Sequence, residues 1–172
     1  MWDVKYILKR RDHRGFTLIE ILAILIILGI VSAAIISRVI GTSETSRVAQ
    51  ESVIKNHIRY AQSMAMKQGA IRGIKCAGAD YWLFRTNDPD TAVNQVVLPD
   101  EDNAKVTLAN KNVTMTSFTV FFDANGRPYT AYVDAANNTP VSAVNLLSIT
   151  VGSLPAGSSG TFSIAPETGF IP

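Results

Sequence analysis

The sequence has a single cysteine, Cys76, and only two histidines, His13 and His57. One cysteine excludes an intramolecular disulfide, so the fold must hold without a covalent cross-link. The apolar neighbours Ile74 and Ala77 favour burial of the Cys76 thiol as a small hydrophobic group. The two histidines lie in different parts of the chain, so they do not supply the clustered ligands that a metal site needs.

Patterns that carry enzyme chemistry are also missing. No glycine-rich phosphate loop follows a predicted strand, and Ser, His and Asp do not fall into a recognisable triad. Residues 123–126, DANG, are followed directly by Arg127 and Pro128 and cannot supply the roughly six to eight oxygens of a calcium loop. Asn-Gly between apolar strands instead predicts a hairpin turn. We therefore expect no enzyme, catalytic residue, metal, cofactor or small-molecule substrate.

Lysine and arginine are absent from residues 128–172. The formal net charge of +2 arises from residues 1–15, which carry five basic and two acidic side chains. The rest of the chain has slightly more acidic than basic groups. A general nucleic-acid binder needs a broad positive surface, so nucleic acid is not an expected partner.

Residues 16–36, FTLIEILAILIILGIVSAAII, form one long apolar run with a single ionisable side chain, Glu20, and no proline. About 20 apolar residues in a helix cross the ~30 Å hydrocarbon core of a bilayer. Basic residues crowd the N-terminal side of the run, which predicts a cytoplasmic N-terminus and an exported head. The run is longer than the apolar core of a secretory signal. We expect a basic leader over residues 1–15 and a transmembrane helix over residues 16–41.

The remaining residues, 42–172, form the predicted head, which begins with an amphipathic helix over residues 42–68. Its apolar side chains recur at spacings of three and four, so they share one helical face. They are Ile54, Ile58, Ala61 and Ala65. Gly69 follows as a C-cap. Residues 41–43, Gly-Thr-Ser, either bend the helix or end one segment and cap the next.

After Ala70 the apolar period shifts towards two and turn residues recur, which predicts short strands. The candidate strands are residues 71–76, 81–86, 93–98, 104–108, 113–122, 129–133, 146–151, 160–164 and 169–171. The apolar set changes phase within 113–122, so we expect a bulge or a break there. Trp82 and Phe84 fall on one face of their strand, and Tyr81 and Leu83 on the other. The predicted class is α+β, with a long N-terminal helix packed on an antiparallel sheet.

Residues 14–20, RGFTLIE, and the apolar run after them resemble the processing site of type IV prepilins and type II secretion pseudopilins. The resemblance implies that a prepilin peptidase cuts between Gly15 and Phe16 and that the new Phe16 amine is N-methylated. A carboxylate within a membrane span is energetically costly and usually has a partner, although Glu20 could also reach water at the membrane edge. In this family such a glutamate forms an intersubunit salt bridge with a neighbour's N-terminal amine, which implies an assembly role for Glu20.

The head resembles the H-type minor pseudopilins and related minor pilins in three segments. They are residues 59–65, RYAQSMA, residues 121–128, FFDANGRP, and residues 164–171, IAPETGFI. The resemblance implies a structural subunit that acts in filament initiation or at the tip, in a type IV pilus or a type II secretion system. The implied partners are other pilin subunits, the prepilin peptidase, the inner membrane and the assembly platform.

The resemblance also implies a location: a single pass through the inner membrane with the N-terminus cytoplasmic and the head periplasmic, followed by entry into the filament. The filament-core helix would be residues 16–41. The alternatives are a major pilin, or a DNA-binding or adhesive minor pilin. Major pilins commonly have a disulfide-bounded C-terminal region and major pseudopilins a calcium loop; the chain shows neither, which favours the minor role.

Overall fold

The computed structural model describes residues 16–172, except for the side chains of residues 33–42 within the first helix. The predicted leader, residues 1–15, lies outside the described residues. Helix α1 comprises Leu18–Gln68 and continues through residues 41–43, so no second helix begins there. The chain divides into two compact units, one ending at Val39 and the other comprising Ile40–Pro172. Within the described part of the chain, no helix combines the length and hydropathy needed to span a membrane.

Capping hydrogen bonds satisfy free backbone groups at both ends of α1. The Thr17 carbonyl and hydroxyl accept hydrogen bonds from the Glu20 backbone N–H, at 3.1 and 3.3 Å, which satisfies a free donor of the first turn. At the other end Gly69 takes a left-handed φ of +61°, and the Ala70 N–H donates to the Ala65 carbonyl at 3.3 Å. This is the C-cap predicted from the sequence.

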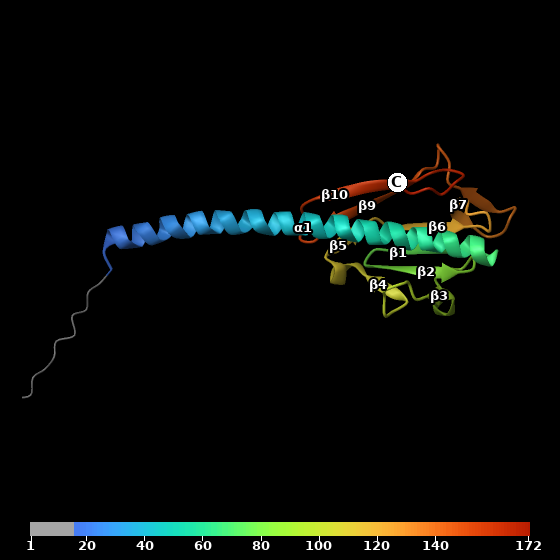
Figure 1. Ribbon diagram of the computed structural model, residues 1–172, viewed down its shortest axis with the longest axis horizontal. Helices are drawn as coiled ribbons and strands as arrows, with labels where there is room; N and C mark the ends of the chain where they lie inside the picture. The colour runs from blue at the N-terminus through green and yellow to red at the C-terminus, as the bar shows by residue number, and fades with distance from the viewer. Residues whose placement is uncertain (1–15) are drawn as a thin grey trace, which may run out of the picture. The chain divides into compact units, whose positions relative to one another are not determined.

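Two antiparallel sheets follow the helix (Figure 1). The larger has the order β3-β2-β1-β6-β7-β8, with β4 also paired to β2, and the smaller has the order β10-β9-β5. The strands are β1 Arg72–Ala77, β2 Asp80–Arg85, β3 Gln95–Val96, β4 Lys105–Thr107, β5 Val113–Met115, β6 Phe118–Phe122, β7 Pro128–Tyr132, β8 Asn138–Pro140, β9 Leu147–Ser153 and β10 Ser159–Ile164. Two 3₁₀ helices, η1 Ala92–Asn94 and η2 Leu108–Lys111, lie between strands.

The predicted break within residues 113–122 is confirmed, because β5 ends at Met115 and β6 begins at Phe118 in the other sheet. The predicted strand at residues 169–171 is wrong. Glu167 and Gly169 both have a φ of +65°, and the Ala165 N–H donates to the Phe170 carbonyl, so this segment folds into a turn. Residues 138–140, which are not among the candidate strands, form β8 against β7.

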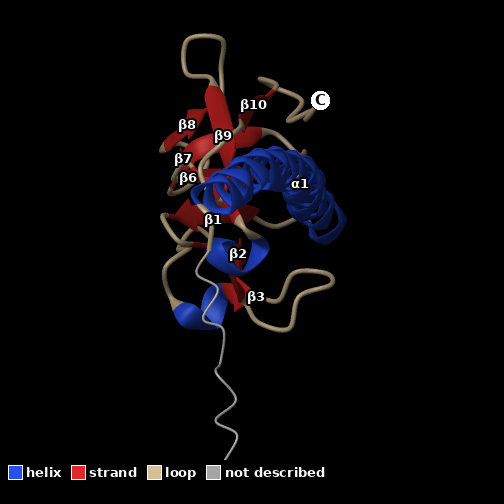
Figure 2. Ribbon diagram, turned by 90° about the vertical axis from the view of Figure 1, so that its left-hand side faces the viewer, coloured by secondary structure: helices blue, strands red, loops and turns tan. Residues whose placement is uncertain are grey.

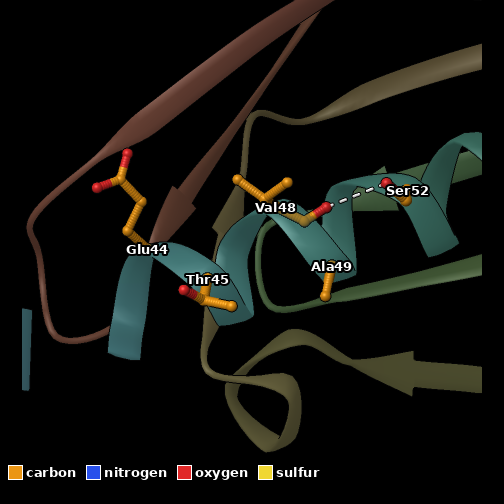
Figure 3. Close-up of a pocket in the computed structure, with 5 residues that line it drawn as sticks. All are labelled: Glu44, Thr45, Val48, Ala49 and Ser52. Carbon is orange, nitrogen blue, oxygen red and sulfur yellow. Dashed lines mark hydrogen bonds between the residues drawn. The ribbon is translucent and has the colours of Figure 1, made fainter. Parts of the chain in front are cut away.

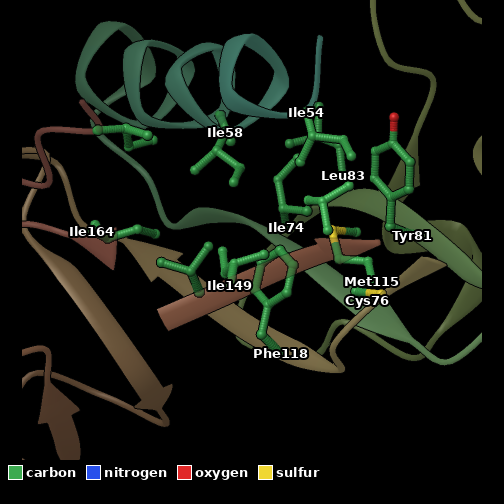
Figure 4. Packing of buried hydrophobic residues seen from close by; sticks show 14 of the residues in the cluster. Ile54, Ile58, Ile74, Cys76, Tyr81, Leu83, Met115, Phe118, Ile149 and Ile164 are labelled. Carbon is green, nitrogen blue, oxygen red and sulfur yellow. The ribbon is translucent and has the colours of Figure 1, made fainter. Parts of the chain in front are cut away.

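The main core lies between one face of α1 and strands of both sheets, and the strands curve around one side of the helix (Figure 2). Ile54 and Ile58 point from α1 towards Ile74 and Leu83 of the larger sheet and Ile149 of the smaller (Figure 4). All four predicted helix-face residues are at most 2% exposed. Each large aliphatic side chain buried in this way contributes about 1.5–3 kcal/mol, so this face fixes the helix to the head.

Cys76 also lies in this core, as predicted. Burial raises the pKa of its thiol to about 11. The thiol therefore stays protonated at neutral pH and packs as a small hydrophobic group.

A second cluster occupies the opposite face of the larger sheet, because side chains alternate along each strand. Trp82 and Phe84 lie here with Phe121 and Tyr129, whereas Tyr81 and Leu83 face the main core. The predicted division of Trp82 and Phe84 from Tyr81 and Leu83 between two faces is confirmed. The rings of Phe84 and Phe121 meet edge to face with centroids 5.0 Å apart. Aromatic packing thus stabilises the sheet on the side away from α1.

Candidate processing and assembly site

The described part of the candidate site begins at Phe16, a residue that is 75% exposed and lies just before α1. Gly15, on the other side of the predicted scissile bond, lies outside the described residues. Glu20 stands in the first turn of α1 and its side chain is exposed. A carboxylate there is stabilised by the positive end of the helix dipole. None of the ion pairs among the described residues includes Glu20.

The helix surface around and after Glu20 is apolar on every side. Large aliphatic side chains at nine positions between residues 21 and 31 are each 45–67% exposed. They are Ile21, Leu22, Ile24, Leu25, Ile26, Ile27, Leu28, Ile30 and Val31. A helix with no polar face is normally covered by lipid or by protein. This stretch therefore needs a covering that the described residues do not supply.

A polar junction at the C-terminal half of α1 is centred on Gln62. Its Nε2 donates hydrogen bonds to the carbonyl of Gly126, at 2.9 Å, and to that of Thr168, at 2.7 Å. Arg59, one helical turn earlier, donates to the Ile171 carbonyl at 2.8 Å. The helix thereby holds both the β6–β7 turn and the turn after β10.

This junction joins the three segments in which the head resembles minor pseudopilins: residues 59–65, 121–128 and 164–171. The predicted hairpin turn at Asn125-Gly126 is confirmed, with Gly126 at a φ of +78° and its N–H donating to the Asp123 carbonyl. The role of Gln62 could not be predicted from the sequence, because no neighbouring residue distinguishes this glutamine from an ordinary solvated one.

At the start of the head, α1 is fastened to the β9–β10 hairpin. The Arg47 guanidinium, whose residue is 8% exposed, donates to Ser158 Oγ at 3.2 Å and pairs with Glu51 at 2.6 Å. Lys55 also pairs with Glu51, at 3.0 Å. Partial burial alone would raise the pKa of Glu51, but hydrogen bonds from Lys55 and Arg47 hold it below its usual value. The i, i+4 spacing of these three charges was a readable signal for this cluster.

A hollow of about 470 Å³ lies along the same part of α1. Glu44, Thr45, Val48, Ala49 and Ser52 line it (Figure 3). The Ser52 hydroxyl donates to the Val48 carbonyl at 3.2 Å, so it is engaged within the helix. The lining holds one carboxylate and no second titratable group, and it offers no arrangement for acid–base chemistry.

Residues 10–36 match the family described as the prokaryotic N-terminal methylation motif. This match supports a type IV pilin-like protein, and an α+β head is compatible with a minor pseudopilin. No curated protein and no solved structure matches the chain. The motif contains Gly15, Phe16 and Glu20, and it points to a structural, pilin-type subunit.

Proposed function

We propose that this chain is a minor pilin or pseudopilin, a structural subunit that enters the filament of a type IV pilus or a type II secretion system and acts in initiation or at the tip. The observation that carries the proposal is the methylation motif over residues 10–36, joined to an exposed apolar helix with one carboxylate. The motif supports the pilin class. The three head segments that meet around Gln62 support the minor pseudopilin type.

In this proposal the prepilin peptidase cuts between Gly15 and Phe16. Glycine offers no side chain that would obstruct the peptidase. The amine of Phe16, four residues before Glu20 and just outside α1, is then N-methylated. Glu20 pairs with the N-terminal amine of a neighbouring subunit, and an apolar environment strengthens that attraction well beyond its value in water.

The precursor is anchored in the inner membrane through residues 16–41, with its N-terminus cytoplasmic and its head periplasmic, before it moves into the filament on the assembly platform. The exposed aliphatic side chains between residues 21 and 31 support an apolar covering of this kind. The basic residues of the leader support the orientation. In the filament the same helix packs among those of other subunits.

Intact-mass analysis of the membrane-extracted protein tests the processing step. The expected product begins with a methylated Phe16, and Gly15→Val should leave the precursor uncut because a branched side chain occupies the cleavage position. A mature N-terminus beyond residue 36 would instead indicate an ordinary signal peptide. Counting subunits in purified filaments tests the minor role, since a major pilin would account for most of the mass.

A further inference from the structure

Arg72 and Arg85 lie directly opposite each other on the neighbouring strands β1 and β2. Side chains alternate along a strand, so Arg72 shares the face of Ile74, and Arg85 shares the face of Leu83. Both aliphatic residues belong to the main core under α1. The arginine pair therefore stands on the helix-covered face of the sheet. Figure 1 shows the end of β2 at the same end of the head as the last turn of α1.

The two arginines have only neutral partners within the described residues. A guanidinium nitrogen of Arg72 contacts Oε1 of Gln68 in the last turn of α1, and Arg85 donates to the Val93 carbonyl at 2.9 Å. Neither arginine belongs to an ion pair of the described chain, whereas other cations of the head do. Those paired cations are Arg47, Lys55, Lys75, Lys111 and Arg127.

The arrangement is unfavourable for the isolated head. Like charges directly opposite each other across two strands repel. Burial and then the charge of Arg85 lower the pKa of Arg72, which shows that its surroundings disfavour the cation. In addition, Nε of Arg72 is buried and has no hydrogen-bond acceptor among the described residues. A buried donor without an acceptor is destabilising, so it adds to the cost of keeping Arg72 at this position.

We propose that Arg72 and Arg85 form a docking site for a carboxylate on an acidic loop of a neighbouring subunit in the filament. Such a group would offset the repulsion, and its two oxygens match the planar donor geometry of a guanidinium. Lys67, exposed in the last turn of α1, adds a third positive charge at this end of the head. Within the loop at residues 100–102, Glu101 pairs with Lys111, but Asp100 and Asp102 are exposed. A second copy of the chain therefore offers carboxylates of the required kind.

Other kinds of ligand fit less well. Nucleic acid is held by many phosphate contacts along a basic surface, and three cations at one end of a head with little net charge do not provide them. The inference rests on the proposed function only in taking the neighbour to be another pilin-type subunit.

The test uses the full chain in its own cells. Arg85→Gln should reduce incorporation into filaments by about tenfold, the order expected when a charge-assisted hydrogen bond is lost. It should not lower the melting temperature of the extracted protein, because it removes a repulsion. Arg72→Gln should also reduce incorporation. The matched control is Arg127→Gln, since Arg127 already pairs with Glu167 within the chain, and it should be incorporated like the parent.

A photo-reactive amino acid in place of Lys67 should cross-link an acidic peptide of another subunit. Replacing the carboxylates of that peptide with amides should reproduce the loss. Cross-links to nucleic acid, or normal incorporation of both arginine variants, would overturn the inference. Failure of the proposed function looks different, because the parent chain itself would then be uncut at Gly15 or absent from filaments.

Discussion

The His57 ring joins helix α1 to Tyr81 of β2, with Nδ1 3.0 Å from the Tyr81 hydroxyl. Its Nε2 lies 3.2 Å from the Pro99 carbonyl, at the start of the acidic loop. A carbonyl only accepts, so Nε2 carries the ring proton and Nδ1 accepts from the hydroxyl. Burial lowers the pKa of His57, and this outweighs the opposite effects of the Pro99 hydrogen bond and of the Glu101 and Asp100 charges.

We therefore predict that the head loses stability in mild acid. The folded state prefers neutral His57, so its contribution is present above the usual pKa of 6.5 and is lost as the pH falls below that value. One proton sets an upper limit of about 1.4 kcal/mol per pH unit on the slope. Denaturant titrations of the mature protein between pH 7.5 and about 5 should show it. In His57→Gln the decline should be shallower, and an equal decline in both proteins would assign it to other groups.

Gly73 in β1 should not tolerate a side chain. A Cβ at this position would lie 2.0 Å from the Val120 carbonyl oxygen and 2.4 Å from the Phe84 ring. The oxygen belongs to the backbone of the paired strand β6 and cannot move aside cheaply. Gly73→Ala should therefore reduce the free energy of unfolding by about 3 kcal/mol. Ala77→Ser, at the exposed end of the same strand, is the control and should have little effect on the denaturation midpoint.

Gln62→Glu should loosen the junction at the C-terminal half of α1. The change keeps the shape of the side chain but replaces a donor with a carboxylate that faces two carbonyl oxygens. The expected loss is about 1–3 kcal/mol at neutral pH, with part of it recovered when the carboxyl is protonated. Hydrogen exchange should rise in residues 123–128 and 165–170. Gln50→Glu on the same helix is the control, and similar exchange in the two variants would contradict the role assigned to Gln62.

Glu20→Gln should separate assembly from processing. Cleavage and membrane retention should persist, because neither requires a carboxylate at this position. Incorporation into filaments should fall, since the amine of a neighbour would be left unpaired in an apolar bundle at a cost of about 3 kcal/mol. Glu20→Asp keeps the charge and should retain part of the incorporation into filaments. Normal incorporation of Glu20→Gln would mean that the glutamate only reaches solvent.

The spacing of apolar residues predicted the elements whose structure depends on residues close together in the chain. The spacing of Ile54 and Ile58 identified the buried helix face, and the change of phase after Met115 identified the break between β5 and β6. The errors arose where non-local contacts decide the structure. Residues 169–171 look like a strand, but hydrogen bonds to Gln62 and Arg59 hold that region in a turn.

The sequence predicts the site residues that are neighbours in the chain, but not those that the fold brings together. Gly15, Phe16 and Glu20 belong to one continuous motif, so the sequence alone predicts their role. The opposition of Arg72 and Arg85 follows from the register of β1 on β2, which a two-residue turn at residues 78–79 sets. A register shift of one residue would place these side chains on opposite faces of their strands. The sequence alone therefore does not show that Arg72 and Arg85 are neighbours.

The composition of the main core also determines when the head can fold. Its helix face lies at residues 54–65, but Ile149, Val151, Phe162 and Ile164 of the last two strands pack in the same cluster. These contacts span about a hundred residues, and contacts of such long range slow folding because a long loop must close first. During synthesis, α1 therefore leaves the ribosome long before the strands that cover it. The head can complete its core only after translation has passed Ile171, which packs in the same cluster.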